Sequence, residues 1–196
     1  MPGHSSSDGG AVMVDGLKLS EYKLANLYIP EVKEKLEKKG YEVVVTSREN
    51  AGGTTPVYSA NAANRTNADI AIEFHFNSAS SKATGSEFLY DVNRPQFKNA
   101  AKAMCFTWSK LTGLKDRGVM PVGSISEVKQ QGEAGRYTTR GINAFKKANM
   151  FFCMTEPFFS SNPDECKFVT QLIDSGKWSD YMADTIEAAC KVLFNK

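Results

Sequence analysis

Residues 68–77 read ADIAIEFHFN, an alternating run that predicts a buried β-strand. Alternate positions of a strand point to opposite faces, so four large apolar side chains share one face and His75 lies on the other with Glu73 and Asn77. A polar loop follows at once, and in open α/β sheets ligands bind at the carboxyl ends of strands. The run therefore predicts a sheet with a site at the end of this strand, although a core histidine bonded to backbone fits the same pattern.

Helical and strand patterns alternate along the rest of the chain. Apolar spacing predicts helices over 20–39, 59–67, 96–111, 163–173 and 178–194, and strands over 41–46, 85–91 and 150–155. Pro30 interrupts the first helix, which predicts a kink or two shorter helices. The alternation predicts an α/β fold: one domain over residues 1–196, with a twisted, mostly parallel sheet flanked by helices on both faces.

Composition excludes several protein classes. The chain has 196 residues and a net charge of +2, and no apolar run approaches the ~20 residues of a membrane helix, so no membrane span is predicted. The opening MPGHSSSDGG has no secretory signal pattern. The protein is thus expected to stay inside the cell, to leave without a signal, or to be shown without its leader. The four cysteines are widely spaced, which favours buried thiols over a metal knuckle, while a Cys166–Cys190 disulfide stays open.

A long basic loop is predicted at about 114–141, where Gly-rich, charged sequence shows no clear period. The wider region 94–147 holds eleven Lys or Arg against three carboxylates, a balance of +8, so the remainder of this +2 chain balances at −6. A solvated, mobile loop explains this charge, and attraction for an anionic polymer is the functional alternative. No nucleic-acid partner is predicted, because the region lacks a recognised binding module.

Three potential metal ligands stand on three separate elements. His4 lies in a Gly/Ser-rich loop, Glu21 at a helix start and His75 at a strand end. Two imidazoles and one carboxylate form a known catalytic zinc set because they leave a fourth position for water, whereas structural zinc sites use four ligands, usually thiolates. Glu21 has an alternative role, since a carboxylate in the first turn stabilises the helix dipole.

Residues 149–159, NMFFCMTEPFF, form an apolar stretch with a single carboxylate, Glu156. Burying a carboxylate costs several kcal/mol unless it is paired or protonated. Burial also raises its pKa toward the range in which a general base works near neutral pH. A structural pair with Arg48 or Arg140 explains Glu156 equally well.

Short motifs follow one another in a specific order. They are Pro2-Gly3-His4 with Asp8-Gly9-Gly10-Ala11, Glu21, Thr46-Ser47-Arg48, Ala60–Asp69 with Asn61 and Asn64, His75-Phe76-Asn77, Gly85-Ser86-Glu87, Arg117-Gly118, and Thr155–Asn162 (TEPFFSSN). Over nearly the whole chain, this series resembles the zinc-dependent N-acetylmuramoyl-L-alanine amidases of the amidase_3 type. Each motif is weak alone, but the ordered series is fairly specific.

The resemblance implies a zinc hydrolase of peptidoglycan. It implies Zn²⁺ bound by His4, Glu21 and His75, Glu156 as the catalytic acid/base, and Asn77 and Arg117 as substrate-binding residues. The implied reaction cleaves the amide between N-acetylmuramic acid and L-alanine of the stem peptide with zinc-activated water. It implies action at the cell wall, as a phage endolysin or a secreted enzyme lacking its leader. The 114–141 loop would then be a lid suited to anionic wall polymers.

Three features depart from the family pattern. Serines occupy positions 5–6 in place of Gly-Gly, only residues 1–3 precede His4 where the family has a strand, and Glu73 replaces a small or apolar residue. Glu73 is expected to pair with a lysine, or else to orient a metal ligand from behind. Two alternatives stay open: another zinc hydrolase, such as a peptidase or deacetylase, or a catalytically inactive wall-binding domain.

Overall fold

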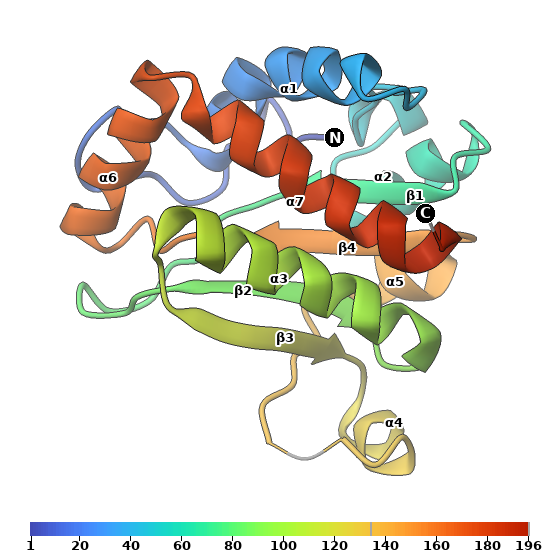
Figure 1. Cartoon of the computed structure of the whole chain (residues 1–196). Coiled ribbons are helices and arrows are strands. Elements are labelled where there is room, and N and C mark those ends of the chain that lie inside the picture. The colour runs from blue at the N-terminus through green and yellow to red at the C-terminus, as the bar shows by residue number, and fades with distance from the viewer. Residues whose placement is uncertain (134, 196) are drawn as a thin grey trace.

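A mixed four-stranded sheet forms the centre of the protein, and the computed structural model describes residues 1–133 and 135–195. Its strand order is β1-β4-β2-β3 (Figure 1). The strands are β1 (Ile70–Phe74), β2 (Ser86–Asp91), β3 (Asp116–Val122) and β4 (Phe151–Glu156). β1 runs parallel to β4 and β2 parallel to β3, whereas β2 and β4 are antiparallel. This arrangement confirms the predicted α/β class.

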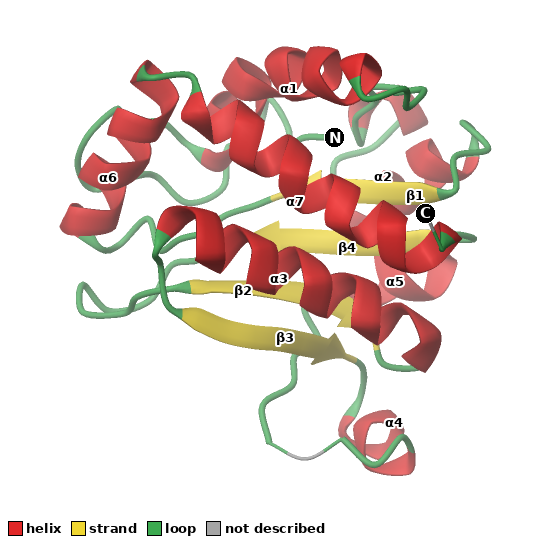
Figure 2. Ribbon diagram, viewed as in Figure 1, coloured by secondary structure: helices red, strands yellow, loops and turns green. Residues whose placement is uncertain are grey.

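Helices cover both faces of this sheet (Figure 2). The helices are α1 (Glu21–Lys38), α2 (Pro56–Asn64), α3 (Lys98–Thr112), α4 (Ile125–Gln130), α5 (Ile142–Lys147), α6 (Pro163–Asp174) and α7 (Lys177–Phe194). α1, α3 and α7 lie over one face, with α6 at its end, and α2 and α5 lie behind the other. Within the described ranges, no helix is both long and apolar enough to cross a membrane.

The period-two pattern of residues 68–77 divides the core as predicted. Ile72 and Phe74 join the core beneath α1, α3 and α7, where Trp108 and Trp178 meet edge to face with centroids 4.8 Å apart. Ala71 belongs to the second core, beneath α2 and α5. Each fully buried large side chain stabilises the fold by about 1.5–3 kcal/mol. β1 is therefore fixed between two layers, and its carboxyl end is a rigid place for a site.

The predicted strand at 41–46 is wrong, although the sequence YEVVVT is β-branched. The segment forms no ladder with any described residue, and Val44 and Val45 are about half exposed. A groove of about 310 Å³ lies between this segment and β1. A strand requires a hydrogen-bonded neighbour, and residues 41–46 lie across the groove from β1 instead of pairing with it. Of the two outcomes predicted at Pro30, a division into two shorter helices is wrong, because α1 continues through this residue.

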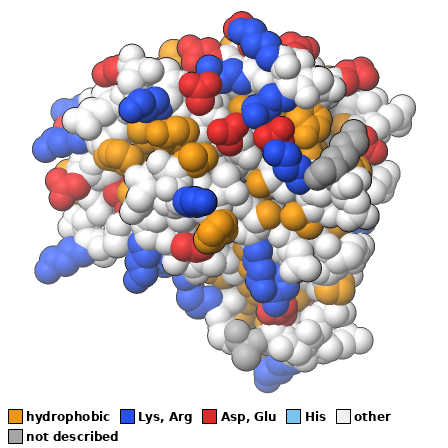
Figure 3. Space-filling model, in the orientation of Figure 1, with side chains coloured by type: hydrophobic (Ala, Val, Ile, Leu, Met, Phe, Trp, Pro, Cys, Tyr) orange, Lys and Arg blue, Asp and Glu red, His pale blue; other side chains and the backbone are white. Residues whose placement is uncertain are grey.

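The predicted long loop at 114–141 is wrong in part, because it contains β3 and α4. β3 pairs in parallel with β2 at the edge of the sheet. α4 begins with a capping box, in which Ser124 and Glu127 satisfy each other's backbone N–H groups. Only the segment after α4 approaches the sheet as a loop, with Thr138 bridged to Val122. In Figure 3, basic side chains predominate along the lower edge of the molecule, whereas both signs of charge mix over α1 and α7.

Candidate metal centre

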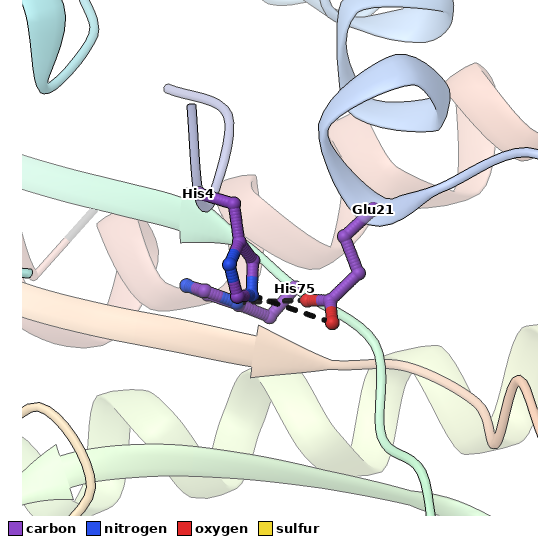
Figure 4. Close-up of side chains that lie close together, drawn as sticks. All are labelled: His4, Glu21 and His75. Atoms are coloured by element: carbon purple, nitrogen blue, oxygen red, sulfur yellow. Dashed lines mark hydrogen bonds and ion pairs between the residues drawn. The ribbon is translucent and has the colours of Figure 1, made fainter. Parts of the chain in front are cut away.

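The three predicted ligands meet at the carboxyl end of β1 (Figure 4). One ligand atom from each of His4, Glu21 and His75 lies within 4.8 Å of the others. Nε2 of His4 is 3.4 Å from Oε1 of Glu21, and Nδ1 of His75 is 2.9 Å from Oε2 of the same carboxylate. The carboxylate thus lies between two imidazoles, each presenting one nitrogen to it.

Backbone pairing with β1 positions His4, although only three residues precede it. The amide of Gly3 donates to the carbonyl of Phe74 at 2.8 Å, and the amide of Phe74 donates to the carbonyl of Met1 at 3.0 Å. His4 itself has a φ of 63°, a left-handed conformation uncommon for residues other than glycine. Such backbone strain occurs at functional sites, where the surrounding structure holds it in place.

Gly10 packs directly against two of the potential ligands. Its φ is +73°, and an added Cβ would lie 2.5 Å from Cδ2 of His4 and 2.9 Å from Oε1 of Glu21. No real Cβ approaches other atoms so closely, so the loop can close over His4 and Glu21 only if this residue is glycine.

The electrostatics of the cluster favour a bound cation. Burial alone would raise the pKa of Glu21, but hydrogen bonds from His4 and His75 hold that pKa well below its usual value. Burial opposes protonation of His75, yet the nearby carboxylates of Glu73 and Glu21 raise its pKa to about 10. The hydrogen bond to Glu21 likewise raises the pKa of His4. The carboxylates thus favour positive charge on the two imidazoles, and a bound metal ion would supply positive charge at the same place.

Glu156 ends β4, the strand next to β1, and is 1% exposed. Thr155 directly precedes Glu156, and its carbonyl accepts a hydrogen bond from the amide of His75 at 3.1 Å. Glu156 therefore lies at the same edge of the sheet as His75. Burial raises the pKa of Glu156 to about 7, although His75 and Arg140 act to lower it. Arg140 bonds Oε1, while Oε2 is buried without a hydrogen-bond partner among the described residues.

Asn77 and Arg117 converge on a further buried carboxylate, Glu87. The amide nitrogen of Asn77 donates to Oε1 at 2.7 Å, and Nε of Arg117 donates to Oε2 at 3.0 Å. Arg136 also bonds Oε2. Glu87 faces Glu156 across the antiparallel pairing of β2 and β4, so these two carboxylates and their arginines form a charged group beside the histidines.

The expected alternative partner of Glu156, Arg140, is confirmed. Sequence reasoning missed Arg136, which comes from the same loop after α4 and pairs with Glu87, and one contact behind His75. Glu73 pairs with Arg48, at 2.8 Å, and the expected lysine pairing is wrong. The only available signal was the presence of a carboxylate in a strand that must be buried on both faces.

Comparisons with known proteins identify the family. The family model for N-acetylmuramoyl-L-alanine amidase matches residues 1–189. The chain belongs to this family. The assignment confirms the predicted enzyme class, a peptidoglycan amidase. No curated protein matched.

Solved structures share the fold of this amidase. The catalytic domain of CwlV from Bacillus (Paenibacillus) polymyxa var. colistinus is 21% identical, with a TM-score of 0.70, over 99% of this chain and 95% of that one. An N-acetylmuramoyl-L-alanine amidase from Clostridium difficile 630 is 23% identical, with a TM-score of 0.66, over 100% and 95%. Cwp6 from Clostridium difficile is 20% identical, with a TM-score of 0.68, over 97% of this chain, but the amidase spans only 28% of Cwp6.

Proposed function

We propose that this amidase binds Zn²⁺ through His4, Glu21 and His75 and hydrolyses the amide bond between N-acetylmuramic acid and L-alanine of the peptidoglycan stem peptide. The observation that carries the proposal is the convergence of two imidazoles on one buried carboxylate at the end of β1. Two histidines and a carboxylate leave a coordination position open, as catalytic zinc sites require. Zinc bound there supplies a Lewis acid that polarises the scissile carbonyl and acidifies a water molecule.

The donor set fits zinc in three respects. Imidazole and carboxylate ligands both suit this ion. The two oxygens of Glu21 face different histidines, so ion and carboxylate can share one small space. The strained His4 and the close approach of Gly10 fix the loop side of that space. These features support a preformed site, although they would also suit another divalent ion with the same ligand preferences.

We assign proton transfer to Glu156. A general base works best when its pKa is near the operating pH, and burial gives Glu156 a pKa of about 7. Its free Oε2 can accept a proton from the attacking water and then deliver that proton to the leaving amine. Arg140 on Oε1 holds the carboxylate in one orientation and leaves Oε2 available.

Asn77 and Arg117 are proposed to bind substrate beside this centre. Both side chains contact Glu87, which holds them in place. Arg136 and Arg140 are about half exposed and add positive charge on the solvent side. This charge supports binding of carboxylates in the stem peptide and of anionic wall polymers, in keeping with an amidase that we propose acts at the cell wall.

The test combines metal content with product analysis. Purified wild-type protein and Glu156→Gln are analysed for zinc and incubated with peptidoglycan. We expect about one zinc per chain in both proteins. The wild type should release stem peptides with a free L-alanine amine. Glu156→Gln should release them about 10²- to 10⁴-fold more slowly.

Glu165→Gln is the matched control, because Glu165 is also buried but bonds Thr84 and two backbone amides elsewhere. It should keep activity. Folded wild-type protein that binds no zinc and releases nothing contradicts the proposal. Cleavage of a different bond indicates another zinc hydrolase instead.

A further inference from the structure

We propose that Glu73 is the positioning residue for the metal ligand His75. It accepts a hydrogen bond from Nε2 of His75, leaves Nδ1 for the ion, and neutralises the Arg48 guanidinium behind the ring. The inference rests on the proposed metal centre and adds to it a residue that holds one of its ligands in place.

One oxygen of Glu73 is fully engaged. Its Oε1 accepts from Nε of Arg48 at 2.9 Å and from Ser59, and it forms an ion pair with Nη2 of Arg48 at 2.8 Å. Glu73 and Ser59 are fully buried, and Arg48 is nearly so. This network attaches Glu73 to α2 and to the loop before it, so the carboxylate cannot turn freely.

The second oxygen, Oε2, has no hydrogen-bond partner among the described residues. Nε2 of His75 lies 3.5 Å from it. A buried polar atom without a partner is strongly unfavourable, and a slight rotation of the ring closes this distance to a normal hydrogen bond. The geometry therefore favours a proton on Nε2, directed at Glu73.

The opposite tautomer is the rival arrangement. Nη2 of Arg48 also lies 3.5 Å from Nε2 of His75, so Nε2 could accept from the guanidinium and Nδ1 would keep its proton. That arrangement leaves Oε2 of Glu73 unsatisfied and blocks the nitrogen that faces Glu21. In the metal-free protein Nδ1 donates to Oε2 of Glu21 at 2.9 Å. A metal ion would displace that proton, and a proton kept on Nε2 would then satisfy Oε2 of Glu73.

The positive charge of Arg48 is a second argument for a carboxylate at position 73. A buried guanidinium directly behind a metal ligand repels a divalent cation, and the low dielectric of the interior strengthens that repulsion. Glu73 pairs with Arg48 and cancels its charge. Ligating histidines in metal sites commonly donate their other N–H to a carboxylate, which fixes the ring and strengthens the ligand.

The first experiment measures zinc affinity. Metal-free wild-type protein, Glu73→Gln and the control Glu165→Gln compete for zinc with a chromophoric chelator at one pH. Loss of a carboxylate behind a ligating histidine should weaken binding about 10- to 100-fold in Glu73→Gln. The Glu165→Gln control should bind like the wild type. Folding of each variant is checked by circular dichroism, so that affinity refers to native protein.

The second experiment reads the tautomer in the wild type. The chain has only two histidines, so long-range ¹H–¹⁵N spectra of the zinc-loaded protein resolve four ring nitrogens. We expect a protonated Nε2 and a metal-bound Nδ1 on His75. The opposite pattern overturns the inference, even if Glu73→Gln does not fold. Glu73→Asp, which keeps the charge but shortens the reach to His75, should also weaken zinc binding.

The outcomes separate the two proposals. Wild-type protein that takes up no zinc overturns the metal centre itself. Wild-type protein that binds zinc, with Glu73→Gln binding it equally well, overturns only the role of Glu73. A purely structural Glu73 would lower the stability of the variant without changing either the zinc affinity or the tautomer.

Discussion

At the scale of single residues, the proposed proton-transfer role of Glu156 comes at the expense of stability. Its pKa rises from the usual 4.5 to about 7, so the native state disfavours the ionised form. That difference corresponds to about 3 kcal/mol of folding free energy. The native state holds this proton more tightly than the unfolded chain does. The contribution of the protonated Glu156 to folding stability is therefore complete below pH 4.5 and is lost as the pH rises through about 7.

Glu156→Gln should accordingly become more stable relative to wild type as the pH rises. The amide carries no charge, so its free energy of unfolding lacks this pH dependence. Between pH 5 and pH 8, the difference between variant and wild type should shift by about 2–3 kcal/mol in favour of the variant. Urea denaturation of the metal-free proteins measures it. An equal difference at both pH values would show that Glu156 is not a buried carboxylate with a raised pKa.

At the scale of elements, the segment of residues 1–10 shows how a short loop can hold a proposed metal ligand, His4. Hydrogen bonds to β1 hold its first three residues, and Gly10 closes it against His4 and Glu21. Gly10→Ala should force these side chains apart and strain the positive φ. We expect zinc affinity to fall by at least tenfold, as measured by chelator competition.

Gly40→Ala is the matched control for that variant. Gly40 also has a positive φ, but an added Cβ there meets nothing within 4 Å. It should lose stability through backbone strain while keeping its zinc affinity. Equal zinc affinity in Gly10→Ala and wild type would mean that the loop does not need this close packing.

The elements also show what sequence can predict. β1 was predictable because its alternation matches two packed faces, and β4 because its apolar run is long. β3 was not, since Gly118 and Pro121 interrupt its pattern, and an edge strand tolerates both. The strand prediction at 41–46 is wrong for the opposite reason. The composition of this segment favours a strand, but strand formation depends on a neighbouring strand that the local sequence does not reveal.

The contacts of the candidate site also divide into those that the sequence could predict and those that it could not. His4, Glu21 and His75 could be found because each carries metal-binding chemistry and the motif order is specific. The contacts of Arg136 with Glu87 and of Arg140 with Glu156 depend on how one loop lies over the sheet. Arg140 could be named as a partner because a buried carboxylate requires one, but the contact of Arg136 with Glu87 had no signature in the spacing of residues, since tertiary packing sets loop conformation.

At the scale of the whole molecule, the proposed metal centre joins the amino-terminal loop, α1 and the end of β1. A ligand that binds only the folded state stabilises it by mass action, and at 100 times the dissociation constant the gain is about 2.7 kcal/mol. For a domain of this size, zinc should raise Tm by about 5–10 °C over the chelated protein. Differential scanning calorimetry with zinc and with EDTA measures the shift. In His4→Ala the shift should be smaller, because the loop no longer supplies a ligand. A wild-type Tm that is the same with zinc and with EDTA would mean that these three elements are held together by protein contacts alone.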